Sequence, residues 1–463
     1  MSKSKLALII KQLSKKECET IKISMLSALV GGKKHHLTLF DAYLTMHRQK
    51  KELTRSEILS KLFKNSISDA KLRLYMSELY KLISLCLVML NSKQDTYYQD
   101  KVLIARFKQN EEHKLYDSQF SSGIERLEKH PYRNAEYLEL KYDLGFQEYE
   151  HVSSSNRTQD LNIQVLLYDL DLIYISKKLR QACFAVSHQA VYGQEYDYGL
   201  LTEILNQVEQ NDLLSYPSIR LYYSAYKMLL SPKQTVYFNQ FKSDIDELKH
   251  YFPDSELQGV YRFAINQCIR RLNRGNMEYG TIALDLYEKA LNSKCLLVDG
   301  YLSRFTFRNI VAIAVRIGEY DRADIFNTEY YSSLRKEERN SALNFNQALI
   351  AYYRKDFDTA LISLQEVDFK DHLFNLAAKV IQMKIYFESE AIDTLESHLD
   401  AMQMYILRKK LIGYYKTNYK NIIKMTRKLL KIKPGDTSAK KVLKGEIDSA
   451  EILTEKKWLL NQF

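Results

Sequence analysis

The chain is poor in glycine and proline, with 14 Gly and 5 Pro among 463 residues. These residues supply the turns that many-stranded sheets and long loops require. Their scarcity therefore argues against a strand-rich fold and favours an all-α chain. Hydrophobic residues make up 46% of the sequence, so a sizeable core is available to its helices.

Cysteine is also scarce, with five residues scattered along the chain and none in a Cys-x-x-Cys pair. We therefore expect neither a disulfide framework nor a zinc centre. The longest apolar run, around 85–90, is far shorter than the roughly 20 residues of a membrane-spanning helix. The apolar run at the start of the chain is too short for a signal peptide. These features predict a cytoplasmic protein without a membrane span.

Catalytic motifs are missing from the sequence. It has no phosphate-cradling glycine loop, no Gly-x-Ser-x-Gly elbow, no His-Glu-x-x-His and no EF-hand pattern. His35 and His36 are the one adjacent histidine pair, and this favours a surface pair over a metal site. We predict no catalytic residue, metal or cofactor, no small-molecule substrate, and no enzymatic activity.

A repeated turn organises residues 256–395. Gly318-Glu-Tyr-Asp-Arg-Ala323 and Lys355-Asp-Phe-Asp-Thr-Ala360 each end one apolar helix and begin another at an alanine. The two alanines are 37 residues apart; Ala283 lies 40 residues before the first, and Leu395 lies 35 residues after the second. Such a period predicts stacked helical hairpins.

The helices between these turns each carry one apolar stripe. The first stripe consists of Phe307, Ile310, Val311, Ala314 and Val315. This spacing places the side chains on one face of a helix. A single helix pair cannot bury its stripe alone, so the pairs must stack into an α-solenoid.

These residues resemble the tetratricopeptide repeat (TPR). Its small, aromatic and apolar positions are matched by Ala348, Phe357, Ala360, Leu364 and Val367. The resemblance covers about a third of the chain, with units longer than the usual ~34 residues. It implies antiparallel helix pairs in a right-handed superhelix. The whole sequence is also similar to Lys- and Tyr-rich helical-repeat proteins of Bacteroidota-type bacteria, through the basic segment 408–431 and the ending 455–460.

The patterns divide the chain into four predicted parts. These are a basic N-terminal helical bundle (1–92), degenerate helical repeats (93–255), TPR-like repeats (256–435) and basic capping helices (436–463). Thr54 and Ser68 are expected to cap two helices of the bundle. That pair could form a helix-turn-helix, although ordinary antiparallel packing is far commoner. Residues 151–156 are the most loop-like stretch and predict an exposed loop or hinge.

Positive charge gathers at both ends of the chain. The formal net charge is +11, of which residues 1–51 hold +8, residues 405–463 hold +10 and the remainder holds −7. A basic stripe on one helix comprises Lys416, Lys420, Lys424 and Lys428, with Arg427 and Lys431 beside it. The stripe predicts either a solvated face or a docking surface for phosphates or acidic protein.

Two functions remain open. The first is a scaffold or adaptor that grips a protein segment on a Tyr-lined concave surface of first helices, with the acidic middle of the chain setting its sign preference. Its candidate contact residues are Tyr261, Arg308, Asn344, Tyr352, Tyr353 and Arg354. The second is a nucleic-acid-associated regulator whose basic ends, including the stripe at 416–431, contact phosphates.

Overall fold

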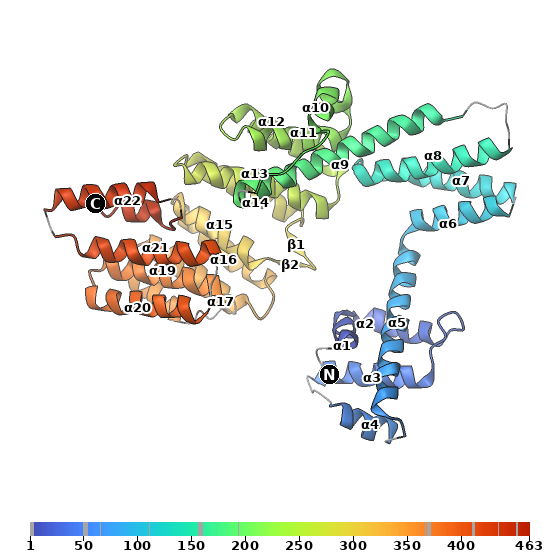
Figure 1. Ribbon diagram of the computed structural model, residues 1–463, viewed down its shortest axis with the longest axis horizontal. Helices are drawn as coiled ribbons and strands as arrows, with labels where there is room; N and C mark the ends of the chain where they lie inside the picture. The colour runs from blue at the N-terminus through green and yellow to red at the C-terminus, as the bar shows by residue number, and fades with distance from the viewer. Residues whose placement is uncertain are drawn as a thin grey trace. The chain divides into compact units, whose positions relative to one another are not determined.

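The computed structural model describes residues 4–49, 54–64, 66–110, 112–155, 161–192, 194–365, 367, 372–409, 413–433, 435–450 and 452–463. Over these residues the chain is all-α, as predicted, with 23 α-helices, three short 3₁₀ helices and one two-stranded hairpin (Figure 1). It forms two compact units. Unit 1 comprises Met1–Pro131 and Ala135–Tyr174, and unit 2 comprises Tyr132–Asn134 and Ile175–Phe463.

Unit 1 begins with a helical bundle. Its helices are α1 (Lys5–Gln12), α2 (Lys15–Met25), α3 (Lys34–Gln49), α4 (Arg55–Phe63) and α5 (Asp69–Gln94). The fully buried Leu39 and Phe40 belong to its core. Thr54 forms the predicted capping box with Glu57, whose carboxylate accepts from the Thr54 backbone N–H at 2.7 Å. Ser68 caps α5 as predicted.

Helix α5 is unusually apolar. Among the described helices it alone has the length and composition of a membrane-crossing segment, and 17% of its apolar window is buried. Core helices of soluble proteins share this length and composition. Large hydrophobic side chains on its exposed surface include Leu74, Leu85 and Val88.

The second part of unit 1 has its own small core. It contains α6 (Thr96–Gln109), α7 (His113–Glu128), α8 (Ala135–Ser155) and the start of α9 (Ile163–Tyr192). Ile104, Tyr116 and Leu127 are buried between its helices. Helix α8 continues through the stretch expected to be a loop, so that prediction is wrong for residues 151–155, while residue 156 lies outside the described residues. The His151 ring stacks on Tyr116 at 3.8 Å, and this tertiary contact supports the extra helical turn.

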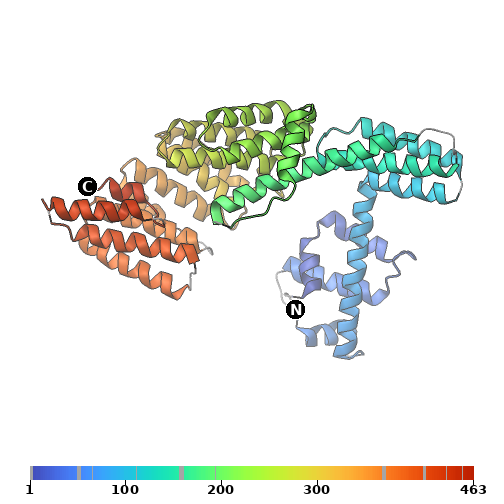
Figure 2. The ribbon, with the colours of Figure 1, turned by 45° about the horizontal axis from the view of Figure 1, so that its top comes forward.

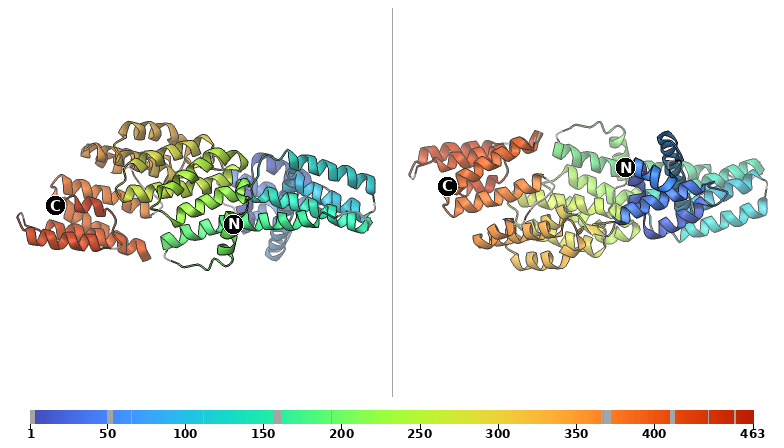
Figure 3. Two further views of the ribbon diagram at one scale, coloured as in Figure 1. Left: turned by 90° about the horizontal axis from the view of Figure 1, so that it is seen from above. Right: turned by 90° about the horizontal axis from the view of Figure 1, so that it is seen from below.

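Unit 2 is a series of helix pairs in which neighbouring pairs pack on one another (Figures 2 and 3). After α10 (Leu201–Gln210) the pairs are α11 (Pro217–Leu230) with α12 (Thr235–Leu248), α13 (Asp254–Asn273) with α14 (Glu278–Asn292), α15 (Arg304–Arg316) with α16 (Tyr320–Tyr330), α17 (Arg339–Tyr353) with α18 (Phe357–Gln365), α19 (His372–Glu388) with α20 (Ile392–Arg408), and α21 (Gly413–Leu430) with α22 (Thr437–Ser449). The short α23 (Lys456–Leu460) follows. The three 3₁₀ turns are Leu213–Ser215, Lys249–Tyr251 and Tyr331–Ser333.

The repeated turn has one backbone conformation in four copies. A residue with left-handed φ ends the first helix of each pair, at Gly275, Gly318, Lys355 and Glu390. The backbone N–H of the next residue donates to the carbonyl five positions back, at 2.9 to 3.1 Å. This is the six-to-one bond of a Schellman cap, which satisfies a carbonyl that the helix end leaves free. The turns predicted at 318 and 355 are therefore confirmed, and the sequence copy near 395 shares the same geometry.

The predicted core positions are also confirmed. The four small or apolar residues that mark the second helices, Ala283, Ala323, Ala360 and Leu395, are fully buried. The apolar stripe that begins at Phe307 is buried throughout. Between α14 and α15 lies a feature that the sequence reasoning missed: β1 (Leu297–Val298) and β2 (Tyr301–Leu302) pair antiparallel around Asp299 and Gly300. Both turn residues have positive φ, as a two-residue hairpin turn requires.

Candidate functional site

The candidate site is a groove in unit 2 of about 350 Å³, lined by the first helices of five successive pairs and by residues just before α23. We call it the inner groove. Its apolar wall includes Leu272, Ile313, Phe345, Leu349, Val380 and Ile381. Its charged lining residues are Arg308, Arg316, Lys384 and Glu455.

Helical spacing explains why these side chains share the groove. Phe345, Leu349 and Tyr353 follow one another at intervals of four on α17, and Arg308 and Arg316 are eight residues apart on α15. Residues at such intervals lie on the same side of a helix. The core stripe lies on an adjacent side of each helix. Each first helix therefore presents one side to its own pair and another to the groove.

Arg308 is a half-buried cation within the groove. Its guanidinium lies over the rings of Phe345 and Phe374, 5.2 and 5.4 Å from their centroids. Its buried Nε has no hydrogen-bond partner among the described residues. Burial lowers the pKa of Arg308, while Tyr419 and Glu455 oppose the shift. The guanidinium therefore faces the groove without a salt-bridged carboxylate in the described part of the chain.

Lys384 is the buried cation at the end of the groove near α23. Its side chain is 6% exposed, and its Nζ lies 3.0 Å from a carboxylate oxygen of Glu455. The same ammonium lies 4.5 Å from the centroid of the Tyr352 ring. Glu455 itself has a left-handed backbone, with φ of 55°. An ammonium removed from water requires an anion close by, which Glu455 supplies.

The groove carries an excess of positive charge. Among the described residues that line it, Arg308, Arg316 and Lys384 are cations and Glu455 is the single carboxylate. Arg316 donates to the Leu272 carbonyl at 2.9 Å, a neutral acceptor that leaves its charge uncompensated. The acidic excess of the middle of the chain is therefore not found on this surface.

Two of the six predicted partner-binding residues, Arg308 and Tyr353, line the groove. Burial, with Glu455 nearby, raises the pKa of the Tyr353 hydroxyl to about 12. Asn344 is half-buried on α17 and does not line the groove. Arg354 is exposed and forms ion pairs with two aspartates of α16.

Tyr261 and Tyr352 belong to the packed interior rather than to a contact surface. Tyr261 is 0% exposed, and burial raises the pKa of its hydroxyl to about 12. Tyr352 is 5% exposed and donates to the Glu388 carboxylate. Both lie in apolar stripes that face neighbouring helices, so their rings are not available to a partner in the groove. The groove residues that the sequence reasoning missed are Arg316, Lys384, Tyr419 and Glu455.

The basic stripe lines a separate hollow of about 520 Å³ between α20 and α21. Lys420, Lys424 and Lys431 are exposed, and no described carboxylate lies within ion-pair distance of them. Lys428 is paired with a glutamate of α22, and Arg427 with an aspartate of α20. The hollow does not include Lys416, which is half-buried. Part of the stripe is therefore neutralised by its neighbours.

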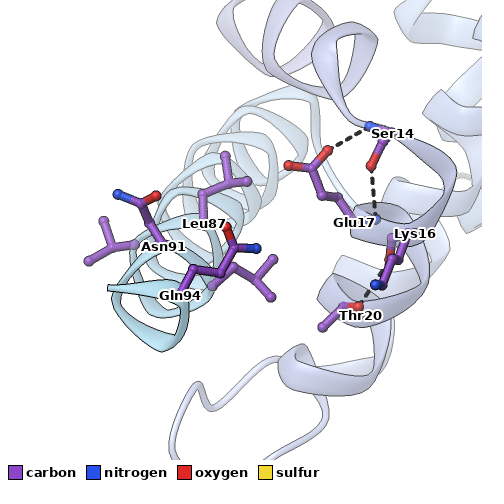
Figure 4. A pocket seen from close by; sticks show the side chains of 9 residues that line it. Ser14, Lys16, Glu17, Thr20, Leu87, Asn91 and Gln94 are labelled. Carbon is purple, nitrogen blue, oxygen red and sulfur yellow. Dashed lines mark hydrogen bonds between the residues drawn. The ribbon is translucent and has the colours of Figure 1, made fainter. Parts of the chain in front are cut away.

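A hollow of about 660 Å³ lies in unit 1 between the start of α2 and the last turns of α5 (Figure 4). Its one described carboxylate, Glu17, accepts from the Ser14 backbone N–H at 2.7 Å as part of a capping box. These bonds to Ser14 hold the pKa of Glu17 below its usual value. The carboxylate therefore stabilises the start of α2.

His35, His36 and Glu78 lie close enough together to resemble a metal site. His36 is 3% exposed, so the expectation of a surface pair is wrong for this residue. Its Nδ1 accepts from the Lys33 backbone N–H at 3.1 Å, and its Nε2 lies 3.0 Å from Glu78. A neutral ring that accepts at Nδ1 carries its proton at Nε2, where it donates to Glu78. His36 Nε2, the ring atom that faces His35 and Glu78, then has no lone pair for a metal. His36 instead caps the start of α3 through its Nδ1.

The inner groove is thus the part of the described chain where apolar walls and unpaired cations converge from several helices. It holds no constellation of nucleophile, base and oxyanion donors that would indicate catalysis among those residues. Comparison of the chain with protein-family models, with curated proteins and with solved structures finds no match.

Proposed function

We propose that this chain is a non-enzymatic cytoplasmic adaptor that binds a segment of another protein in the inner groove of a TPR-like stack of helix pairs. One observation carries the proposal. The first helices of five pairs contribute to a single groove with apolar walls, in which Arg308 and Arg316 lack a carboxylate partner among the described residues. A bacterial origin, which the Lys- and Tyr-rich repeat suggests, belongs to the same proposal.

The proposed mechanism is non-covalent. The groove is built on helices whose adjacent faces are packed in the core, so it needs little rearrangement before binding, which keeps the entropic cost low. Apolar side chains of the segment would pack on the half-buried Ile269, Leu349 and Tyr353 and supply most of the affinity. The arginines would fix its register and select its charge.

Site-specific photo-crosslinking tests this function. Benzoylphenylalanine is placed at Asn309, an exposed residue that lines the groove, and in a control chain at Ile325, which is 58% exposed on α16. Both chains are irradiated in native cytosol after nuclease treatment and at high salt. We expect one defined segment of a partner protein to be joined through Asn309 and not through Ile325. The same adducts at both positions, or none at Asn309, would contradict the proposal.

The second candidate is a nucleic-acid-associated regulator, and the observation that favours it is the exposed, unneutralised trio Lys420, Lys424 and Lys431. Replacing all three with glutamate should flatten the salt dependence of oligonucleotide binding, by roughly 0.9 in the log–log slope for each phosphate that the chain no longer neutralises. The control chain carries the same reversal on α22, at 440, 441 and 444. Equal reductions of the slope in the two chains would indicate general charge and contradict a specific role for the stripe.

A further inference from the structure

We infer that the segment bound by the inner groove carries a carboxylate, and that Glu455 of this chain holds the place of that carboxylate until the segment displaces it. The inference rests on the proposed function and names the chemistry of its ligand. It starts from Lys384, whose ammonium lies in the groove wall with 6% of the side chain exposed. Among the described residues, Glu455 is the one carboxylate within ion-pair distance of it.

The surroundings of Lys384 make the position selective for an anion. The rings of Tyr352, Tyr353 and Trp458 lie 4.5, 5.8 and 6.0 Å from the ammonium and keep water away from it. A neutral group in place of Glu455 would leave a buried charge without a partner, which is strongly unfavourable. A ligand carboxylate would restore the pair. Exchange of the Glu455 carboxylate for a ligand carboxylate therefore keeps the charge of Lys384 neutralised both before and after the ligand binds.

The rest of the groove remains short of negative charge after Glu455 is counted. Arg308 and Arg316 lie along the same wall, and no described carboxylate is within ion-pair distance of either. The buried Nε of Arg308 has no acceptor among the described residues. The C-terminal segment thus satisfies one cation of three. A partner segment with acidic residues at two positions can satisfy more of them than Glu455 does.

The C-terminal segment is held in a way that permits release. Glu455 has a left-handed backbone conformation that L-residues adopt at a cost and keep only where the surroundings hold them. The helix that follows has five residues and is anchored by Trp458, whose Nε1 donates to Glu388 at 2.7 Å, and by the buried Leu459. Just before it, the Ile452 carbonyl accepts from Asn421 at 2.8 Å. Separation of Glu455 from Lys384 removes the ion pair that fixes this strained residue.

The test uses fluorescein-labelled synthetic peptides that copy residues 450–463, one with Glu at position 455 and one with Glu455→Gln. Their binding to the full chain is measured by anisotropy for the wild type, for Glu455→Gln/Trp458→Ala, whose own segment is loosened, and for the same chain with Lys384→Met added. Circular dichroism checks that each chain is folded. If the double variant does not fold, Glu455→Gln alone provides the same comparison with a smaller increase in peptide affinity.

We expect the loosened chain to bind the Glu peptide about tenfold more tightly than the wild type does, and about tenfold more tightly than it binds the Gln peptide. The Lys384→Met change should remove the difference between the two peptides. Equal binding of both peptides by the loosened chain, or equal binding of the Glu peptide by wild-type and loosened chains, would overturn the inference.

The crosslinking experiment separates this inference from the proposed function. A partner segment joined through Asn309 that contains no Asp or Glu would leave the adaptor function standing and overturn the carboxylate inference. Peptide discrimination with no partner joined at Asn309 would support the carboxylate pocket and contradict the adaptor function.

Discussion

Glu388 joins the C-terminal segment to the stacked helix pairs, and its removal gives the sharpest test of the structure. One carboxylate oxygen accepts from both the Tyr352 hydroxyl and the Trp458 Nε1, and the other accepts from Lys355. The Glu388 side chain is 12% exposed. Two donors from the end of α17 and its turn and one from α23 thus share one acceptor group.

The loss of stability caused by Glu388→Ala depends on which hydrogen-bond donors are left without a partner. Tyr352 is 5% exposed and Trp458 is 9% exposed, so Glu388→Ala leaves two buried donors unpaired, at about 1–3 kcal/mol each. Lys355 has a side chain 68% exposed, so its ion pair is worth at most about 1 kcal/mol. We expect the free energy of unfolding to fall by about 3 kcal/mol. Glu388→Gln retains an oxygen for both buried donors and should cost about 1 kcal/mol.

The assay is urea unfolding followed through the fluorescence of Trp458, the single tryptophan of the chain. This residue reports directly on the C-terminal segment, while circular dichroism reports on all helices. Glu396→Ala, at an exposed site on α20, serves as the control and should change stability by less than about 0.5 kcal/mol. If the alanine and glutamine variants lose equal stability, or if neither shifts the Trp458 transition, the convergence of donors on Glu388 does not stabilise the segment.

Three further predictions concern stability. Burial raises the pKa of Glu388, but its hydrogen bonds outweigh burial and lower the pKa below the usual value, so the stability that the Glu388 carboxylate contributes is complete above about pH 5 and is lost as the pH falls. The difference in urea midpoint between wild type and Glu388→Gln should therefore shrink towards pH 3, and a difference that stays constant with pH would refute this. Gly280→Ala would place a Cβ 2.3 Å from a methyl carbon of the β-branched Ile317 and should lower the free energy of unfolding by about 2 kcal/mol. Gly445→Ala, where a Cβ meets open space, should raise the free energy of unfolding by up to about 1 kcal/mol. Equal effects of the two substitutions in thermal unfolding would contradict the close approach at Gly280. Glu256 is 5% exposed and accepts hydrogen bonds from two buried side chains, so Glu256→Ala should cost about 3 kcal/mol by urea unfolding, and a loss below about 1 kcal/mol would show that those donors find other partners.

The helices and the repeated turn could be predicted because their causes are local. An apolar stripe, a capping Thr54 and a turn at Gly318 each depend on residues within a few positions of one another. The hairpin at 297–302 was equally local and was missed. Its signal was Asp299-Gly300 between two pairs of apolar residues, the residue pair that favours a two-residue turn. Composition over the whole chain could not reveal four strand residues.

The groove could be predicted only in part, because both exposed and buried faces of its first helices are apolar. Tyr353 faces the groove, but its neighbour Tyr352 faces the packed interior. A stripe in the sequence does not say which of two apolar faces meets a neighbouring helix. Lys384 and Glu455 are 71 residues apart, so their pairing depends on the packing of the whole C-terminal part. One local signal existed, which is that two lysines, Lys379 and Lys384, interrupt the apolar run of α19.

The segment around α23 both packs against α19 to α22 and places the Glu455 carboxylate in the inner groove, so the proposed displacement of Glu455 would link binding to stability. Trp458 and Leu459 belong to the core cluster that holds α19 to α22 together. A ligand that displaces Glu455 also weakens the hold on these two residues. By thermodynamic reciprocity, the factor by which the ligand would favour release of the segment equals the factor by which release of the segment would strengthen ligand binding. Under the proposed function, displacement of Glu455 would therefore couple partner binding to a conformational change in the segment that contains Trp458 and Leu459.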